Sequence, residues 1–341
     1  MAFGDNRLPL KSRSELELKL NCSSPASAVA TFPQKANAYV LSLIQSAHDP
    51  IGRQVLPDPR ELDDQTAGND PLAEESQSPA PQIIHRYPNR VVFLVSDQCA
   101  VHCRFCMRKR RVTVGGEVGA HLIEQGLHYI RSQSQINEVV LSGGDPLMLD
   151  DGRLTGVLQA LRSIPHVRLL RIHTRIPSML PQRVTQALAQ RLAAFRPIYV
   201  NIHFNHPAEL TPQARHACGL LADAGIPLGS QTVLLKGIND EPGTLIELFE
   251  TLLELRVRPY YLHQLDRVPG TAHFRVALDN ALALLAKLRG QLSGLAIPHF
   301  MVDLPGGGGK VALTPQAILK KEENHWLIRN WEGHIFQYPF G

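Results

Sequence analysis

The sequence has 341 residues, a net charge of +4 and an apolar fraction of 44%. This length accommodates one large α/β barrel or two average domains, and the composition is that of an ordinary globular protein. No stretch approaches the roughly 18 apolar residues of a membrane span, and the N-terminus lacks the apolar segment of a signal peptide. The net charge is too small to indicate nucleic acid by itself. We therefore expect a cytoplasmic protein with no membrane and no nucleic-acid partner.

Residues 1–84 differ from the rest of the chain in composition and in the spacing of apolar residues, which predicts an arm made of helix and loop. Apolar residues at three- and four-residue spacing predict a helix over Ala36–Ala47. The segment Asp58–Pro81 is rich in Asp, Glu, Ser and Pro, which predicts a surface loop. We expect this arm to be an accessory cap on the remaining chain.

From Val91 onward, short apolar runs alternate with longer amphipathic ones, which predicts six β–α units and a parallel sheet. Six units are two short of a closed eightfold barrel, so a partial (β/α)6 TIM-like barrel over residues 85–304 is the first interpretation. A doubly wound sheet is the second, and residues 305–341 form a C-terminal segment and tail. The expected strands are Val91–Ser96, Glu138–Ser142, Leu169–His173, Ile198–His203, Gly229–Leu234 and Tyr260–His263. The expected helices lie near His121–Ser132, Leu154–Ser163, Arg183–Ala194, Pro212–Ala224, Thr244–Arg256 and Asn280–Ser293.

Side chains that could take part in catalysis or ligand binding lie at or after the ends of most predicted strands. Cys99 follows the first strand, Ser142 ends the second, His203 ends the fourth, and Asp266 follows the sixth, while Gln231 lies within the fifth. In both candidate folds, ligands gather at the carboxyl ends of the strands. This distribution therefore predicts an active site at that end of the sheet.

Three cysteines lie within eight residues, in the segment Cys99-Ala-Val-His-Cys103-Arg-Phe-Cys106. Three thiolates can hold three irons of a [4Fe–4S] cluster and leave the fourth iron open for a substrate. Structural zinc needs four ligands, usually in two separated pairs, so it fits this spacing less well. His102 could supply a fourth ligand, but we expect it to point elsewhere. A redox pair formed by Cys103 and Cys106 is the simpler alternative.

Two glycine-containing segments are candidate binding loops. In Ser142-Gly143-Gly144-Asp145, the glycines would let the backbone approach a ligand closely, although a tight β–α turn is the simpler explanation. In Asp303–Lys310, four consecutive glycines could direct backbone N–H groups at a phosphate, or could act as a hinge. Lys310 could form a Schiff base. The segment is not a Walker loop, because no Ser or Thr follows the lysine.

Arg104 and the run Arg108–Arg111 form a basic cluster beside the cysteines. Read alone, such a cluster could bind nucleic acid. No aromatic platform or recognised nucleic-acid motif accompanies it. Anionic cofactors and a substrate carboxylate explain it more simply, and Lys109–Arg111 could also be an ordinary solvated surface.

The cysteine loop, together with the turn after the second strand, resembles that of the radical S-adenosylmethionine enzymes. The resemblance implies that the open iron binds the methionine moiety and that an electron from the cluster releases a 5′-deoxyadenosyl radical. The implied S-adenosylmethionine contacts are Ser142, Gly143, Gly144, Asp145, His203 and Gln231.

A longer stretch, from about Asp49 to about Leu313, is similar to the lysine 2,3-aminomutase family. Segments that carry this similarity include His85–Arg90, Leu141–Pro146 and Asp303–Lys310. The implied roles are Lys310 as the catalytic lysine that binds pyridoxal 5′-phosphate, Arg86 and Arg90 as further ligands of that cofactor, Arg108 as the ligand of the substrate carboxylate, and Asp266 and Asp303 as partners of the distal ammonium of lysine.

The two aspartates suit a lysine substrate. A buried ammonium must be paired, and its charge keeps two neighbouring carboxylates ionised. A relative specific for glutamate would need cationic or neutral groups at these positions. The simpler alternative is that Asp266 caps a loop and Asp303 caps a turn.

The resemblance therefore implies an isomerase that converts L-α-lysine to β-lysine by radical 1,2-amino migration. Two alternatives stay open. The first is the branch of the family that makes (R)-β-lysine for modifying elongation factor P, and the second is an iron–sulfur protein without aminomutase activity. The resemblance also implies an electron donor such as flavodoxin or ferredoxin, and it allows a homo-oligomer.

Overall fold

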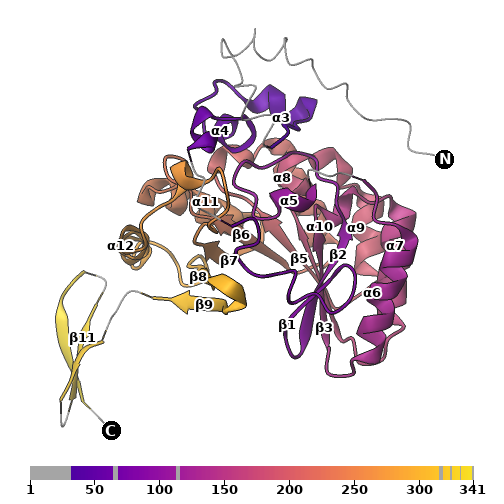
Figure 1. Ribbon diagram of the computed structural model, residues 1–341. Helices are drawn as coiled ribbons and strands as arrows, with labels where there is room; N and C mark the ends of the chain where they lie inside the picture. Colours follow the sequence, from indigo (N-terminus) through magenta and orange to yellow (C-terminus); the bar gives the residue numbers. More distant parts are fainter. Residues whose placement is uncertain are drawn as a thin grey trace.

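The computed structural model describes residues 32–63, 68–112, 116–314, 318–322, 325–330 and 332–339. The first 31 residues of the expected arm lie outside the described residues. A curved sheet with helices on one side forms the body of the molecule, and a small C-terminal sheet projects from it (Figure 1). In the described part of the chain, no helix is long and apolar enough to cross a membrane.

Among the described residues the main sheet has nine strands, and their order in the sheet is their order in the chain. Strands β2 to β8 are parallel neighbours, whereas β1 and β9 pair antiparallel at the two ends. The expected α/β barrel is confirmed as an open one, because β1 and β9 do not pair with each other. The strands are β1 (Ile83–Tyr87), β2 (Arg90–Ser96), β3 (Glu138–Gly143), β4 (Leu169–Thr174), β5 (Ile198–His203), β6 (Leu228–Val233), β7 (Val257–His263), β8 (His299–Leu304) and β9 (Gly309–Leu313).

The six predicted strands correspond to β2–β7, and the six predicted helices correspond to the long helices that follow these strands. Strands β1, β8 and β9 were not predicted, and neither was the separate antiparallel sheet of β10 (Ile318–Lys321), β11 (His325–Arg329) and β12 (Ile335–Pro339). The long helices are α6 (Ala120–Ser132), α7 (Asp151–Arg162), α9 (Gln186–Ala193), α10 (Pro212–Asp223), α11 (Pro242–Glu254) and α12 (Leu278–Leu288).

Helix α10 shows why these segments fold as they do. The side chain of Thr211 accepts a hydrogen bond from the backbone N–H of Ala214 at 3.1 Å, and a proline occupies the first helical position. Its buried residues recur at helical spacing, so one face packs on the sheet. These residues are Ala214, Ala217, Cys218 and Leu221.

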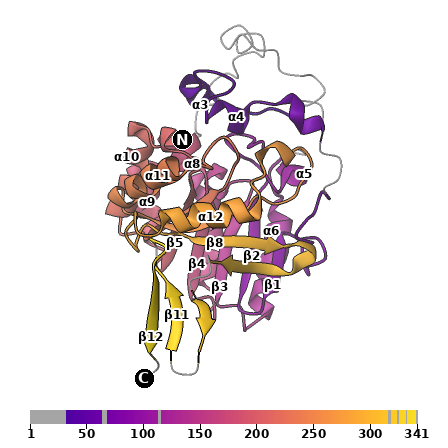
Figure 2. The same cartoon turned by 90° about the vertical axis from the view of Figure 1, so that its left-hand side faces the viewer.

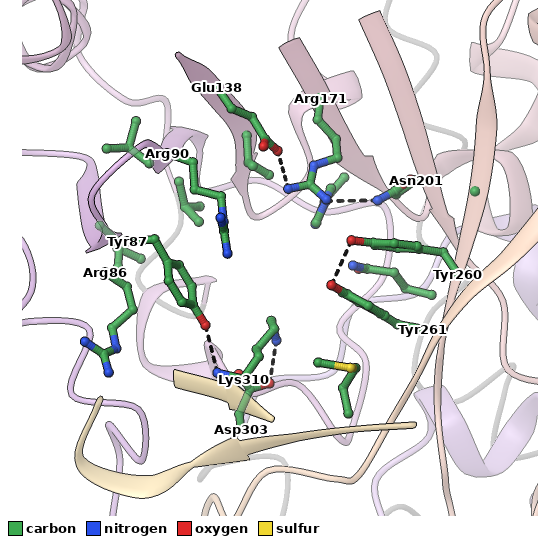
Figure 3. A pocket seen from close by; sticks show the side chains of 18 of the residues that line it. Arg86, Tyr87, Arg90, Glu138, Arg171, Asn201, Tyr260, Tyr261, Asp303 and Lys310 are labelled. Atoms are coloured by element: carbon green, nitrogen blue, oxygen red, sulfur yellow. Dashed lines mark hydrogen bonds and ion pairs between the residues drawn. The ribbon is translucent and has the colours of Figure 1, made fainter. Parts of the chain in front are cut away.

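Side chains alternate between the two sides of each central strand. In β4, Leu170 and Ile172 are fully buried, whereas Arg171 and His173 line a cavity inside the curve of the sheet. Figure 3 shows Arg171 and Asn201 pointing into this cavity from neighbouring strands. The barrel interior therefore receives polar side chains such as Arg171 and His173, while the apolar core lies between the sheet and its helices.

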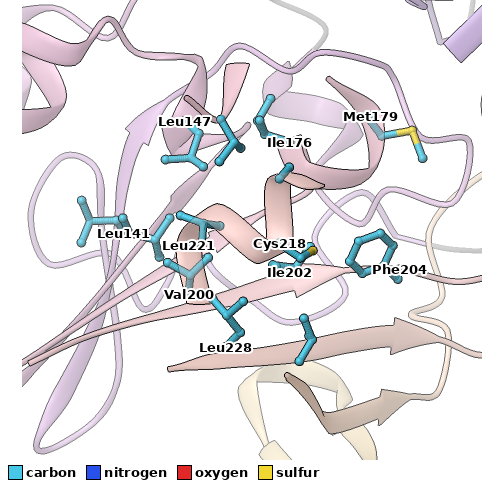
Figure 4. Packing of buried hydrophobic residues seen from close by; sticks show 14 of the residues in the cluster. Leu141, Leu147, Ile176, Met179, Val200, Ile202, Phe204, Cys218, Leu221 and Leu228 are labelled. Atoms are coloured by element: carbon cyan, nitrogen blue, oxygen red, sulfur yellow. The ribbon is translucent and has the colours of Figure 1, made fainter. Parts of the chain in front are cut away.

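The apolar core is continuous on the helical side of the sheet (Figure 4). Val200 and Ile202 of β5 lie against Cys218 and Leu221 of α10. Each fully buried aliphatic side chain of this kind contributes about 1.5–3 kcal/mol to folding. The short helix α8 (Ile176–Met179) adds its own buried residues to the same core.

The described part of the arm is less helical than predicted. The expected helix Ala36–Ala47 is only α3 (Ala38–Leu43). The chain then turns around Asp49, whose carboxylate accepts four backbone N–H groups at 2.6–2.8 Å. This turn follows the helix and leads into α4 (Gly52–Val55), which is followed by the 3₁₀ turn η1 (Pro59–Leu62) and the loop to β1. A further short helix, α5 (Lys109–Val112), comes after the cysteines.

Candidate active site

Two adjoining cavities occupy the interior of the barrel. The first, here called the inner cavity, measures about 1010 Å³ and is lined by Arg90, Tyr87 and Lys310 among others. The second, here called the cysteine cavity, measures about 300 Å³ and lies at the carboxyl ends of the strands. Arg108, Asp303 and Lys310 line both cavities. The two spaces are therefore parts of one site.

The three clustered cysteines lie together on the wall of the cysteine cavity, directly after β2. Burial and the neighbouring sulfurs raise the pKa of Cys99 well above its usual value and that of Cys106 to about 11. Such thiols give up their protons when they bind a metal. Among the described residues, no three His, Cys, Asp or Glu side chains converge on a point that could hold one metal ion. A [4Fe–4S] cluster does not need this convergence, because each thiolate binds a different iron.

The two polar residues between the cysteines face the arm. The Nδ1 atom of His102 lies 2.7 Å from the carbonyl oxygen of Pro33, and its ring stacks on Phe32. The prediction that His102 points elsewhere is confirmed. Arg104 is fully buried and pairs with Glu61 of η1 at 2.5 and 2.8 Å. These buried contacts therefore attach the arm to the cysteine loop.

The turn after β3 lies so close to the segment before the cysteines that only glycine fits there. Gly143 has a φ of +125°, and a Cβ atom there would lie 2.1 Å from the carbonyl oxygen of Ser96. Gly144 donates its N–H to that same oxygen at 2.5 Å. A side chain at Gly143 would push the turn away from the segment that leads into Cys99.

Asp145, at the end of this turn, is hydrogen-bonded within the protein. Its Oδ1 atom accepts from the hydroxyl of Thr174 at 2.7 Å, and its Oδ2 atom accepts from the backbone N–H of Arg175 at 2.7 Å. Burial raises the pKa of Asp145 to about 6, although these hydrogen bonds oppose the shift. The carboxylate joins the end of β3 to the end of β4 beside the cavity.

Arg175 is a site residue that the sequence analysis did not assign. Its Nη1 atom donates to the sulfur of Cys103 at 2.8 Å, and its Nη2 atom donates to Gln54 at 2.6 Å. It also pairs with the buried Glu209 at 3.2 Å. Its position after β4, among the polar strand ends, was the available signal.

Buried histidines line the interior of the barrel. His203 of β5 contacts Asn205, with 2.9 Å between Nε2 and Oδ1, and burial lowers its pKa to about 3. Burial also holds the pKa values of His173 and His263 well below the usual range. These rings are therefore neutral at physiological pH. Gln231 of β6 lines both cavities.

Lys310 lies on β9 directly opposite Asp303 on β8. Its Nζ atom is 2.5 Å from Asp303 Oδ2, and its backbone N–H donates to the hydroxyl of Tyr87 at 2.8 Å (Figure 3). The glycines before Lys310 form the turn of the β8–β9 hairpin. Gly306, Gly307 and Gly309 have positive φ values, which explains why the chain needs glycine there.

The two arginines of the β1–β2 hairpin take different directions. Arg90 extends toward the middle of the inner cavity in Figure 3, with its guanidinium 3.9 Å from the centre of the Tyr87 ring. Arg86 also lines the cavity, but its guanidinium points away from the middle in the same view. The structure thus places Arg90 inside the cavity and Arg86 at its rim.

Arg108 and Asp266 complete the wall between the cavities. The guanidinium of Arg108 lies 3.4 Å from the hydroxyl of Ser142 and is bound by Glu74 at 2.7 Å. Burial and the charge of Asp303 raise the pKa of Asp266 to about 7, while Lys310 and Arg108 oppose the shift. Asp266 therefore titrates near neutrality and would gain from a nearby cation.

The basic cluster has protein partners that were not predicted. We expected anionic cofactors and a substrate to account for it, and carboxylates of the arm also pair with three of its arginines. Three of its arginines bind acidic residues of the segment read as a surface loop, in which Glu61 and Glu74 are only 5% exposed. Acidic residues of this loop therefore pair with one buried arginine, Arg104, and with two half-buried ones, Arg108 and Arg110. The pairs are Arg104–Glu61, Arg108–Glu74, Arg110–Asp70, Arg110–Glu74 and Arg110–Glu75.

Comparison with known proteins gives two family matches. Residues 93–249 match the model of the radical SAM superfamily, and residues 285–340 match that of lysine-2,3-aminomutase. The L-lysine 2,3-aminomutase of Fusobacterium nucleatum is 43% identical over 88% of this chain and 72% of its own length. That of Clostridium subterminale is 41% identical over 92% of this chain and 76% of its own length. A glutamate 2,3-aminomutase of Clostridioides difficile is 41% identical over 88% of this chain and 72% of its own length.

A parallel barrel with three cysteines after its first parallel strand, together with the match over residues 93–249, makes this a radical SAM protein. Relatives above 40% identity then narrow the assignment, because they align with most of the chain. The chain belongs to the lysine 2,3-aminomutase family. The cofactors of that family are a [4Fe–4S] cluster, S-adenosylmethionine and pyridoxal 5′-phosphate. The donor sets present, three thiols in one cavity and a lysine amine in the next, fit them.

Proposed function

We propose that this protein is an L-lysine 2,3-aminomutase, which converts L-lysine to β-lysine. The observation that carries the proposal is the shared wall of the two cavities. The cysteines lie in one space, Lys310 lies between the two, and Arg108 and Asp303 border both. A substrate held there is within reach of both cofactors, as radical transfer to a bound amino acid requires.

In the cysteine cavity, Cys99, Cys103 and Cys106 would hold the [4Fe–4S] cluster. Ser142, Gly143, Gly144, Asp145, His203 and Gln231 would bind S-adenosylmethionine. When bound, the cofactors supply a carbon radical for hydrogen abstraction and a conjugated ring that accepts unpaired electron density. The protein contributes orientation and excludes water. The neutral His203 can hydrogen-bond a ligand there without adding charge.

In the inner cavity, Lys310 would hold pyridoxal 5′-phosphate through its amine. Arg90 and Arg86 suit the phosphate, because a guanidinium presents paired donors to phosphate oxygens. Arg90 is already ordered by its stacking on Tyr87. With these assignments, the arginines that would hold the phosphate lie on the β1–β2 hairpin, and the lysine that would hold the cofactor borders the cysteine cavity.

Arg108 would bind the substrate carboxylate, and Asp266 with Asp303 would bind the distal ammonium. The raised pKa of Asp266 supports this assignment, since two close carboxylates need a cation to stay ionised together. The glutamate 2,3-aminomutase relative makes glutamate the competing substrate. A third carboxylate beside Asp266 and Asp303 would be repelled, which favours lysine.

The activity can be tested with anaerobically reconstituted protein, S-adenosylmethionine, pyridoxal 5′-phosphate and a reductant. We expect β-lysine from lysine and little or no β-glutamate from glutamate. Turnover of glutamate alone would contradict the lysine assignment, and no turnover of either amino acid would contradict the aminomutase assignment.

The variant Lys310→Ala separates an aminomutase from an iron–sulfur protein without this activity. We expect the variant to lose the visible absorbance of bound pyridoxal 5′-phosphate and to retain its iron. Unchanged visible absorbance in the variant would show that Lys310 does not hold the cofactor.

Three further assignments belong to this proposal. A flavodoxin or ferredoxin would donate the electron to the cluster. A cytoplasmic location suits thiols that must stay reduced, and the four described cysteines are free. A homo-oligomer is supported by exposed apolar side chains on β12, namely Ile335, Phe336 and Tyr338.

A further inference from the structure

Residues 69–78 form a fold-back segment, here called the acidic strap, that lies against the active site. Its turn is internally braced, since Asp70 accepts hydrogen bonds from the backbone N–H groups of Glu74 and Glu75 at 3.0 and 2.9 Å. Ala73 has a φ of +52°, an unfavourable value for a residue other than glycine. The turn therefore holds a strained conformation that delivers Glu74 to the cavity wall.

The strap is also attached at both sides of the site. Pro71 accepts a hydrogen bond from the backbone N–H of Gly306, in the hairpin that carries Lys310, at 3.0 Å. Arg110 donates to the carbonyl oxygen of Asn69 at 3.2 Å and pairs with Asp70 at 3.0 Å. The strap thus bridges the lysine hairpin and the segment after the cysteines.

Glu74 binds one edge of the Arg108 guanidinium. Its Oε1 atom accepts from Nε at 3.0 Å and from Nη2 at 2.7 Å. Nη1 is left on the opposite side, where its contact with the hydroxyl of Ser142 is long, at 3.4 Å. Arg108 lines both cavities and Ser142 lines the cysteine cavity, so Nη1 lies at the shared wall where the substrate is proposed to bind.

We propose that Glu74 is a positioning residue, which fixes the Arg108 guanidinium so that Nη1 receives the α-carboxylate of the substrate. This inference rests on the proposed function, because it takes Arg108 as the carboxylate ligand. A free arginine side chain has several rotatable bonds, and fixing them before binding lowers the entropic cost of binding.

The surroundings of Glu74 argue against its simply competing with the substrate for Arg108. Its side chain is only 7% exposed, and Arg110 holds Oε2 at 3.1 Å. Arg108 and Arg110 lower its pKa although burial opposes them, so it stays ionised. Two arginines and the braced turn keep it in place, while Nη1 has N–H groups to offer.

The test compares Glu74→Gln with Glu75→Gln. Glu75 is the next residue of the strap and pairs with Arg110 at 3.2 Å, but it is largely exposed and does not touch Arg108. Both variants remove one negative charge from the same turn. For each protein, binding of lysine and of lysinamide is measured by the absorbance change of bound pyridoxal 5′-phosphate without reductant. Lysinamide lacks the carboxylate charge.

We expect Glu74→Gln to weaken lysine binding about tenfold while changing lysinamide binding little, so that the preference for lysine falls. Glu75→Gln should keep the wild-type preference. Equal weakening of both ligands would indicate general structural damage and would overturn the proposal. Tighter lysine binding by Glu74→Gln would show that Glu74 competes for Arg108, and it would also overturn the proposal.

The result can be separated from failure of the proposed function. If the wild-type protein converts glutamate instead, the same comparison is made with glutamate and its α-amide, since every amino-acid substrate carries the α-carboxylate. A wild-type protein that shows no preference for the acid over the amide would refute the role of Arg108 itself.

Discussion

Asp266 is the carboxyl group whose ionisation should control substrate binding. Burial and Asp303 raise its pKa to about 7 in the free site. The ammonium of lysine, with a pKa near 10.4, is charged throughout this range and favours the ionised carboxylate. Lysine should therefore bind more tightly as the pH rises through 7, by about tenfold between pH 6 and pH 8. The absorbance of bound pyridoxal 5′-phosphate reports this binding.

The matched variant for this prediction is Asp266→Asn, which keeps the shape of the side chain and removes its charge. We expect weaker lysine binding that changes little over the same pH range. A wild-type affinity that stayed constant from pH 6 to pH 8 would show that Asp266 is not a partner of the ammonium.

Arg175 should affect the reduction potential of the cluster. Its Nη1 atom donates to Cys103 at 2.8 Å, and hydrogen bonds to cluster sulfurs stabilise the reduced state. The substitution Arg175→Lys keeps a positive charge beside Glu209 but removes the planar guanidinium group that donates to Cys103. We expect the midpoint potential to fall by about 50–100 mV, which corresponds to one or two tenfold steps for one electron.

A redox titration followed by electron paramagnetic resonance measures the effect of Arg175→Lys without any turnover. Arg183→Lys is a control, because Arg183 binds backbone carbonyl groups and Asp151 rather than a cysteine. If both variants kept the wild-type potential, the contact between Arg175 and Cys103 would have no influence on the cluster.

At the scale of elements, the turn after β3 and the cysteine loop behave as one unit. Gly143→Ala would bring a Cβ atom within about 2.1 Å of the Ser96 carbonyl oxygen, at a φ that disfavours any side chain. We expect the loop to shift and the reconstituted protein to lose most of its iron. Iron analysis and the visible spectrum measure this loss.

Gly156→Ala is the control for the turn variant. Gly156 lies in the exposed face of α7 with no atom within 4 Å of an added Cβ, so alanine should be tolerated there and raise stability by roughly 0.5–1 kcal/mol. Full iron content in Gly143→Ala would mean that the turn can move without disturbing the cysteines.

The elements that could be predicted from sequence are those in which burial produces a regular spacing of apolar residues. Strands β2–β7 carry buried apolar residues on the side that the helices cover, and the cysteines and Lys310 stand in recognisable motifs. Strand β9 was missed because three of its five residues are exposed, which leaves no apolar run. The contacts Glu74–Arg108 and Arg175–Cys103 join residues 34 and 72 positions apart, and no local spacing signals them.

At the scale of the whole molecule, the two edge strands of the sheet, β1 and β9, meet at the active site. Strand β1 carries Tyr87 and strand β9 carries Lys310, at opposite ends of the strand order. In Figure 2, β8 passes in front of the strands at the beginning of the sheet. The hydrogen bond from the Lys310 N–H to the Tyr87 hydroxyl therefore closes the barrel where strand pairing does not.

Tyr87→Phe tests this closure, because phenylalanine keeps the ring on which Arg90 stacks and removes only the hydroxyl. We expect the free energy of unfolding to fall by about 1 kcal/mol, the usual contribution of one hydrogen bond. The amide of Lys310 should also exchange its hydrogen faster, since it loses its acceptor. Tyr199→Phe is the control, because the Tyr199 hydroxyl has no hydrogen-bond partner among the described residues and the side chain is 43% exposed. Equal exchange rates at Lys310 in both variants would show that the two sheet ends stay together without this bond.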